Sequence, residues 1–262
     1  MQRTWTHFVI GVGEFLLLLL LFVVLINVRW TSMDDCFKPA PDRDTCYCEA
    51  FSGGLVKQPA NTWSALTMSI PGLLVLASLG FARPDGSNPM TRHALLPATF
   101  GYSAVFLGPG SMFFHSTFSD LGGFLDSTSM YLFLSFVLVY QLLRLTRMPL
   151  WLAALVWVAQ NALLFTLARV TGAPTLVFAL LGVATGVVQI VVFTRETLRY
   201  SAWFWAAIGT FAVAFTIWLL SRTGMPLCAP QSALQGHALW HVLSALTVGG
   251  FYLYLRRAPD LP

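Results

Sequence analysis

Long runs of apolar residues, separated by short polar stretches, extend over almost the whole chain. As helices, these runs are long enough to cross the hydrocarbon core of a bilayer, which needs about 20 apolar residues. We therefore predict eight membrane helices, at about residues 8–28, 63–81, 94–115, 121–143, 150–168, 173–194, 201–220 and 233–255. One polar stretch is much longer than the others and covers residues 29–62.

Composition agrees with this pattern. The 262 residues are 56% hydrophobic and only 10% charged, with a mean hydropathy of +0.70, which excludes an ordinary soluble globular domain. We predict an all-α integral membrane protein. It has an additional N-terminal transmembrane helix at 1–28, an external cysteine-containing loop at 29–62 and a seven-helix bundle at 63–262. The first run could also be a cleaved signal peptide, but its length and the lack of a small-residue cleavage pattern favour a retained helix.

The basic residues give the orientation. The net charge of +4 does not indicate nucleic-acid binding, because arginines and lysines stand singly at the ends of apolar runs. With a cytoplasmic N-terminus, the short external loops hold only Arg169 and Arg222. The cytoplasmic segments then carry Arg3, Arg83, Arg92, Arg144, Arg147, Arg195, Arg199, Arg256 and Arg257. The positive-inside rule therefore places both termini in the cytoplasm.

The same topology places every cysteine outside. Cys36, Cys46, Cys48 and Cys228 all fall in predicted external segments, which indicates an oxidising compartment and disulfide bonds. Four cysteines allow three pairings, and the sequence does not choose among them. A Cys-x-Cys metal site or free thiols are the alternatives.

Three histidines lie within or at the edge of apolar runs near the predicted external face. His237 and His241 are four residues apart, so a helix places both imidazoles on one side, about one turn apart. His115 can supply the third ligand. Three protein ligands and an open position for water are typical of catalytic zinc. A single membrane histidine is more often a packing residue, but three at one depth favour a zinc site.

Two further polar residues lie near the predicted zinc site. Asp126 is an ionisable group in an apolar segment, where it is costly unless paired or hydrated. It could accept the proton of a zinc-activated water and return it to a leaving group. Ser111 lies one helical turn before His115 and could stabilise an oxyanion, although a membrane serine often bonds only to its own helix backbone.

With Ser111, His115, Asp126, His237 and His241 in place, the chain resembles the alkaline ceramidases and the wider CREST superfamily of membrane hydrolases. The shared motifs are S-x-x-x-H, an aspartate in the following helix, and H-x-x-x-H in the last helix. The resemblance implies zinc held by the three histidines, with the serine and the aspartate beside the catalytic water. It also implies a seven-helix CREST-type bundle, to which the first helix is an addition.

The resemblance, which covers residues 46–255, also implies a function. We expect hydrolysis of the N-acyl bond of ceramide or a related lipid amide to a sphingoid base and a fatty acid. The expected partners are this membrane lipid and the bilayer itself. Two other branches of the superfamily remain open, namely a lipid esterase or phospholipase of lipid-anchor remodelling and a receptor in which zinc is mainly structural.

Segment 47–64 resembles the ceramidase segment that binds calcium. Glu49 and Asn61 stand at suitable positions, and Asp44 could supply a further carboxylate. Gln58, however, stands where the family has a glutamate. Calcium prefers several carboxylate ligands, so the sequence leaves a calcium site open.

Overall fold

The computed structural model describes residues 5–28, 47–81, 86, 88–196 and 201–261. Within these residues the secondary structure is helical and contains no strand, which confirms the predicted all-α class. The helices are α1 (Trp5–Ile26), α2 (Pro59–Ala65), the 3₁₀ helix η2 (Leu66–Met68), α3 (Ser69–Ser78), α4 (Pro89–Arg92), α5 (Leu95–Thr117), α6 (Asp120–Thr146), α7 (Leu150–Thr171), α8 (Pro174–Phe193), α9 (Ser201–Leu220) and α10 (Gly236–Arg257).

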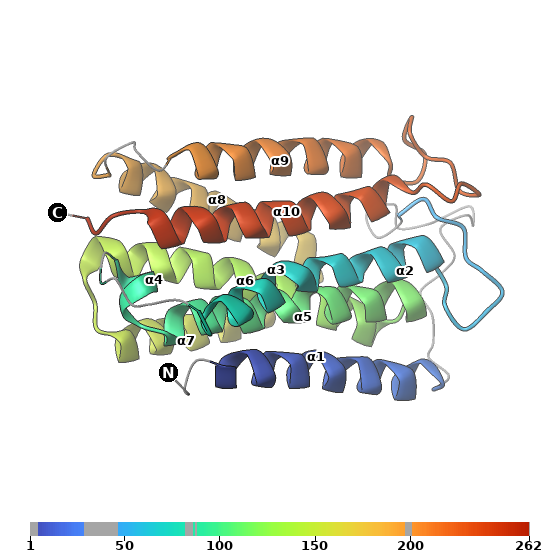
Figure 1. Ribbon diagram of the computed structural model, residues 1–262. Helices are drawn as coiled ribbons and strands as arrows, with labels where there is room; N and C mark the ends of the chain where they lie inside the picture. Colours follow the sequence, from blue (N-terminus) through green and yellow to red (C-terminus); the bar gives the residue numbers. More distant parts are fainter. Residues whose placement is uncertain (1–4, 29–46, 82–85, 87, 197–200, 262) are drawn as a thin grey trace.

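The long helices lie side by side in an elongated bundle (Figure 1). Helix α1 packs against α3 and α5 on one side, and α9 packs against α10 on the opposite side. Helices α5 and α6 are neighbours in the middle of the bundle. Helix α1 begins and α10 ends at the same end of the bundle, at the left of Figure 1.

Seven spans within the described residues are long and apolar enough to cross a membrane. Helix α5 is not among them, although it has 23 residues, because glycine, proline and polar residues make it less apolar. Most of its residues are buried by neighbouring helices. The second predicted run also begins earlier than expected, since Pro59 starts α2 at a position where proline is well tolerated.

Pro109 interrupts the backbone hydrogen bonds of α5 near its middle. Proline has no N–H, so the carbonyl of Val105 loses its usual partner one turn later. The hydroxyl of Ser69 in α3 donates to this carbonyl at 2.7 Å. Gly108 permits the close approach, because a Cβ there would overlap the Ser69 hydroxyl and approach the α2 backbone. A neighbouring helix thus supplies the missing bond, as membrane bundles require.

A buried polar network joins α6, α8 and α10 near the end of the bundle where α10 finishes. Arg144 pairs with Glu196 and donates to the Gln141 side chain at 2.9 Å. The Tyr254 hydroxyl donates to the same glutamate at 2.9 Å and accepts from Gln189 at 2.7 Å. The arginine and glutamate side chains are only 1% and 4% exposed. Removing one partner would leave a buried charge without compensation, so the network holds these helices in register.

We expect Ser69→Ala to destabilise the protein, because it leaves the Val105 carbonyl buried without a donor. An unsatisfied buried acceptor costs about 1–3 kcal/mol, which should lower the midpoint of thermal unfolding in detergent. Thr166→Ala is the matched control, since the Thr166 hydroxyl is exposed and bonds only its own helix at Ala162. Equal midpoints for the two variants would contradict this account of α5.

Candidate metal centre

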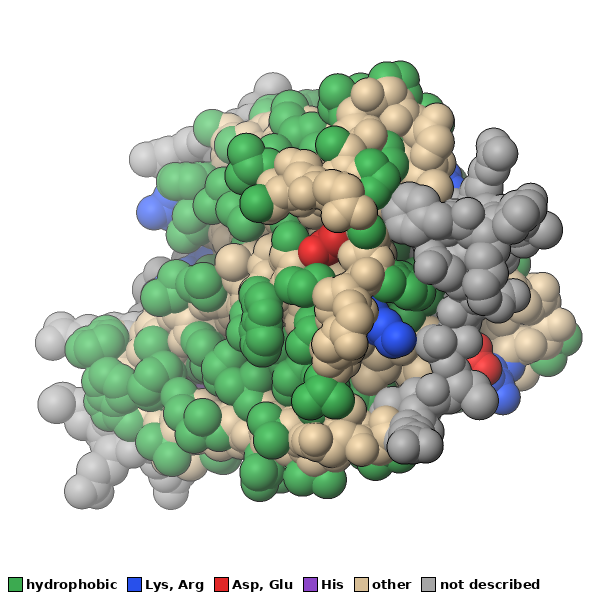
Figure 2. All heavy atoms as spheres, turned by 90° about the vertical axis from the view of Figure 1, so that its right-hand side faces the viewer, with side chains coloured by type: hydrophobic (Ala, Val, Ile, Leu, Met, Phe, Trp, Pro, Cys, Tyr) green, Lys and Arg blue, Asp and Glu red, His purple; other side chains and the backbone are tan. Residues whose placement is uncertain are grey.

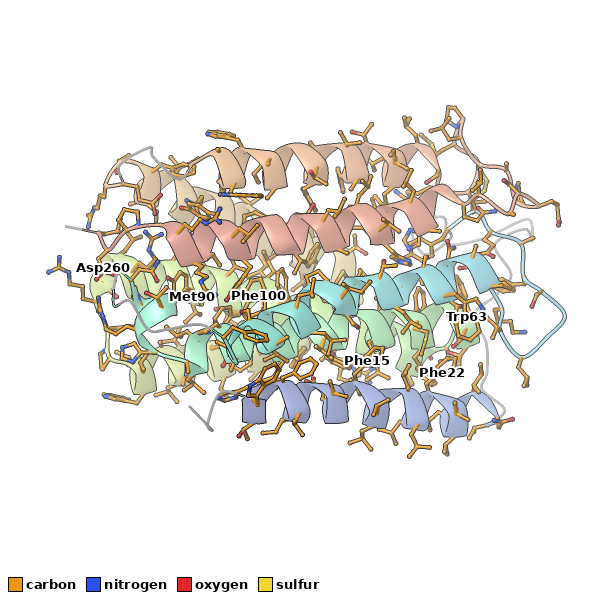
Figure 3. The ribbon with its side chains drawn as sticks, in the orientation of Figure 1. Phe15, Phe22, Trp63, Met90, Phe100 and Asp260 are labelled. Atoms are coloured by element: carbon orange, nitrogen blue, oxygen red, sulfur yellow. A yellow bond between two sulfur atoms is a disulfide. The ribbon has the colours of Figure 1, made fainter. Side chains whose placement is uncertain are left out.

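The turn between α5 and α6 brings His115 back toward the start of α6. Helix α5 ends two residues after His115, where Phe118 takes a left-handed conformation with φ of 48°. The Ser119 side chain then caps α6 by accepting a backbone N–H of its first turn at 3.1 Å. His237 and His241 lie in the first two turns of α10. All three histidines therefore meet at the end of the bundle where α2 lies, marked by Trp63 in Figure 3.

The three imidazoles form a compact, buried group. The possible ligand nitrogens of His115, His237 and His241 all lie within 4.8 Å of one another. The side chains are 1%, 6% and 1% exposed. Nε2 of His115 is 3.0 Å from Nε2 of His237. Figure 2 views the molecule from this end, where hydrophobic side chains surround a small number of charged ones.

The outer nitrogen of His115 is held by Gln58. The Gln58 amide nitrogen donates to the backbone carbonyl of Glu49 at 2.9 Å, which leaves the amide oxygen as an acceptor. This oxygen lies 2.8 Å from His115 Nδ1. Nδ1 therefore carries the proton, and Nε2 of the neutral ring keeps a lone pair that faces the other histidines.

His241 is oriented in the same way by Ser64, within α2. The Ser64 hydroxyl donates its single proton to the Asn61 carbonyl at 3.1 Å. It can then only accept from His241 Nδ1, which is 2.8 Å away. Nε2 of His241 is consequently the nitrogen with a free lone pair.

This donor set suits a metal ion. Hydrogen bonds to the outer nitrogens of ligating histidines are the usual arrangement around zinc. Two nitrogens bound tetrahedrally at about 2.0–2.1 Å from zinc would lie about 3.3 Å apart, close to the observed His115 to His237 contact. His237 Nδ1 is buried and has no hydrogen-bond partner among the described residues. The three histidines could therefore hold a metal ion.

Ser111 and Asp126 lie beside the triad. The Ser111 hydroxyl is 3.4 Å from Nε2 of His241 and also bonds the side chain of Asp126. Asp126 lies in the second turn of α6 and is partly buried. The α5–α6 turn thus brings a hydroxyl and a carboxyl close to the three histidines.

Tyr47 covers the triad from the segment before α2. Its ring centroid lies 4.2 Å from that of His237 and 5.0 Å from that of His115. Burial raises the pKa of Tyr47, and the Asp126 carboxylate raises it further, while the Arg222 guanidinium opposes these effects. The phenol is therefore neutral and remains a hydrogen-bond donor near the Asp126 carboxyl.

A disulfide holds this segment in place. Cys48 is bonded to Cys228 in the loop between α9 and α10. This confirms that the chain contains a disulfide, and it identifies which cysteine pairs with Cys48. The backbone N–H of Cys48 also donates to the Thr223 hydroxyl of that loop at 3.1 Å. Cys36 and Cys46 lie outside the described residues. The crosslink ties the segment that carries Tyr47 to the loop that leads into α10, the helix with two of the histidines.

Among the predicted calcium ligands, Glu49 is hydrogen-bonded to other groups. Glu49 caps α2, since its two carboxylate oxygens accept the N–H groups of Ala60 and Asn61 at 2.7 and 2.9 Å. Burial raises the Glu49 pKa, and these two donors lower it. The Asn61 side-chain oxygen is buried without a partner among the described residues, and Asp44 lies outside them. Calcium takes about 6–8 oxygens. The described residues alone do not make a calcium site, which stays a prediction that depends on Asp44.

Three contributors were not assigned from the sequence. Gln58 and Ser64 were noted only as part of the calcium-like segment, and Tyr47 had no role. The only sequence feature that could have indicated one of these roles was Gln58, which stands where the family has a glutamate. A glutamine in that position supplies both a donor for Glu49 and an acceptor for His115.

The family model described as Ceramidase matches residues 55–258. The chain belongs to the ceramidase family. The match includes Ser111, Asp126 and the three histidines, and it supports a ceramidase-like hydrolase. The comparison with curated proteins gives no significant match.

We expect Gln58→Leu and Ser64→Ala each to weaken metal binding by about 10–100-fold, the usual effect of removing a partner that orients a ligating histidine. Competition with a chelator measures the affinity. Thr67→Ala is the control for the serine, because the Thr67 hydroxyl bonds the backbone of Ser64 and does not contact a histidine. If both site variants retained metal as the wild type does, the proposed orientation of the imidazoles would be wrong.

Proposed function

We propose that this ceramidase-family protein is a zinc-dependent intramembrane amidohydrolase. It hydrolyses the N-acyl bond of ceramide or a related lipid amide to a sphingoid base and a fatty acid. The observation that carries the proposal is the buried triad of His115, His237 and His241, with Ser111 and Asp126 in contact beside it. Family membership favours an amide bond as the substrate.

Zinc is the proposed metal because three imidazoles, two of which have an outer nitrogen held by a hydrogen-bond acceptor, match a catalytic zinc site. When bound, it would supply a Lewis acid and lower the pKa of a water molecule toward about 7. His115 and His241 present Nε2 through their bonds to Gln58 and Ser64. His237 completes the set from the first turn of α10.

Asp126 and Ser111 supply the proton transfer and the oxyanion stabilisation in this proposal. The Asp126 carboxyl would take a proton from the attacking water and deliver it to the nitrogen of the departing sphingoid base. The Ser111 hydroxyl would donate to the carbonyl oxygen of the substrate as negative charge develops there. Its bond to Asp126 positions the two groups relative to each other.

The membrane setting suits a lipid substrate. The surrounding helices expose apolar side chains on their outer faces, such as Leu155 and Val183 at 58% and 64%, as a bilayer requires. The triad lies near one end of the bundle, so acyl chains could remain among the helices while a polar head group reaches water. In the proposed topology this end is external and both termini are cytoplasmic. Residues 1–28 are then an additional membrane helix. The segment predicted as an external loop at 29–62 is external as far as the start of α2 at Pro59.

Purified protein should contain about one zinc per chain. The His237→Ala, His241→Ala double variant should lose the metal, because a single remaining histidine binds it weakly. His93→Ala, which alters a histidine outside the triad, should keep the wild-type content. Elemental analysis measures all three proteins. A wild type without zinc, or a double variant with normal zinc, would refute this metal assignment.

Asp126→Asn should retain zinc but lower kcat by roughly 10²–10⁴-fold, the typical effect of losing a proton-transfer residue. Asp120→Asn is the matched control, since Asp120 is an exposed carboxylate in the first turn of the same helix. Mass spectrometry of products from a panel of ceramides, other N-acyl lipids and phospholipids gives the rates. A wild-type rate in Asp126→Asn would remove its assigned role. Cleavage of ester lipids alone would favour the esterase branch instead.

A further inference from the structure

A polar cavity lies at the end of the bundle far from the histidines. It has a volume of about 450 Å³ and lies between α4, the end of α6, the start of α7 and the C-terminal segment. Met90 and Asp260, labelled in Figure 3, mark this end, and Trp63 marks the metal end. We propose that this cavity binds the phosphate-bearing head group of an anionic phospholipid. Nothing in the amide hydrolysis above requires such a site.

The charged residues of the lining are predominantly basic. Arg92, Arg144, Arg147 and His93 line the cavity, and Asp260 is the only acidic residue among its lining residues. Arg92 is paired with Asp260, and Arg144 with Glu196. The charges of three arginines are thus opposed by two carboxylates. Phosphate would supply the missing negative charge.

Arg147 carries the unbalanced charge. Its guanidinium donates to the backbone carbonyl of Leu261 at 3.1 Å, and within the described residues it has no ion-pair partner. The side chain is exposed, so an incoming anion can reach it. Arginine forms paired hydrogen bonds with phosphate oxygens, a geometry that one backbone carbonyl does not satisfy.

Arg144, a buried residue of the cavity lining, has a hydrogen-bond donor without an acceptor in the part of the chain that the structure describes. Its side chain is 1% exposed, yet its Nε has no hydrogen-bond partner among the described residues. A buried donor without a partner is rare in native structures and costs about 1–3 kcal/mol, more when it is charged. An oxygen of a bound ligand, directly or through water, would satisfy it. Within the described residues, the unpaired charge of Arg147 and the unsatisfied donor of Arg144 are separate observations, and both favour an anionic ligand.

The remaining lining favours a lipid over a free anion. Leu143, Met148, Leu150 and Leu261 lie beside the arginines, which gives the cavity both an apolar and a cationic part. Trp151, next along α7, is 69% exposed, and exposed tryptophans are typical of the membrane–water interface. The positive-inside rule predicts that this end is cytoplasmic, where anionic phospholipids are concentrated. Basic pockets between membrane helices on that side commonly bind such head groups.

The test is lipid binding by the full-length protein in a neutral detergent. Dioleoyl phosphatidic acid is the probe, dioleoyl phosphatidylcholine is the zwitterionic comparison, and native mass spectrometry counts the lipids bound. We expect one phosphatidic acid per chain, bound at least tenfold more tightly than phosphatidylcholine. Arg147→Gln should weaken this binding about tenfold or more, whereas Arg147→Lys, which keeps the charge, should weaken it less. Equal affinity for the two lipids would overturn the proposal.

Arg257→Gln is the matched control. Arg257 is another exposed arginine at the same end, but it lies over the Trp203 ring and does not line the cavity. An equal loss in Arg257→Gln and Arg147→Gln would mean non-specific attraction to the basic end and would contradict the proposal. Competition with 10 mM inorganic phosphate separates the sources of the anion. Retention of the lipid supports a head-group site, and complete displacement overturns it in favour of a free-phosphate site.

Discussion

The hydrogen bonds that the outer nitrogens of two histidines donate to Gln58, the N-cap of α2, and to Ser64 within α2 are the constraint on which the proposed centre depends. Gln58 and Ser64 accept from Nδ1 of His115 and His241, so that both rings turn Nε2 toward a common point. Without these acceptors either nitrogen of each ring could carry the proton. The short helix α2 and its N-cap residue thus determine which nitrogens of His115 in α5 and His241 in α10 are available to a metal.

Several separate features place α2 where it can do this. The Glu49 carboxylate caps its first turn, and the Cys48–Cys228 disulfide ties the preceding segment to the loop before α10. Ser69 lies in α3, which follows α2 in the same membrane span. Its hydroxyl donates the hydrogen bond to the Val105 carbonyl of α5 that Pro109 cannot supply. Helix α2 is therefore connected to both of the helices that carry histidines. The Arg144 network performs a similar structural role at the opposite end of the bundle.

Much of the fold followed from hydrophobic run lengths, because a membrane helix needs a long apolar stretch whatever its neighbours. The histidine set was recognisable for a related reason, since polar residues are costly in such stretches and stand out. The contributions of Gln58, Ser64 and Tyr47 were not recognisable, because each depends on contacts between segments far apart in the sequence. The partner of Cys48 was likewise undetermined, since it lies 180 residues away. Helix α5 is less apolar than its neighbours for a tertiary reason, because packing and polar contacts take the place of lipid.

The central claim is that three imidazoles and no sulfur ligand hold a zinc ion at the end of the bundle near α2. X-ray absorption at the zinc edge tests this directly on the purified, intact protein. The account predicts about three imidazole nitrogens at roughly 2.0–2.1 Å and one further oxygen ligand. A spectrum with sulfur at about 2.3 Å would place the metal on cysteines instead. That result, or the absence of bound zinc, would contradict the account.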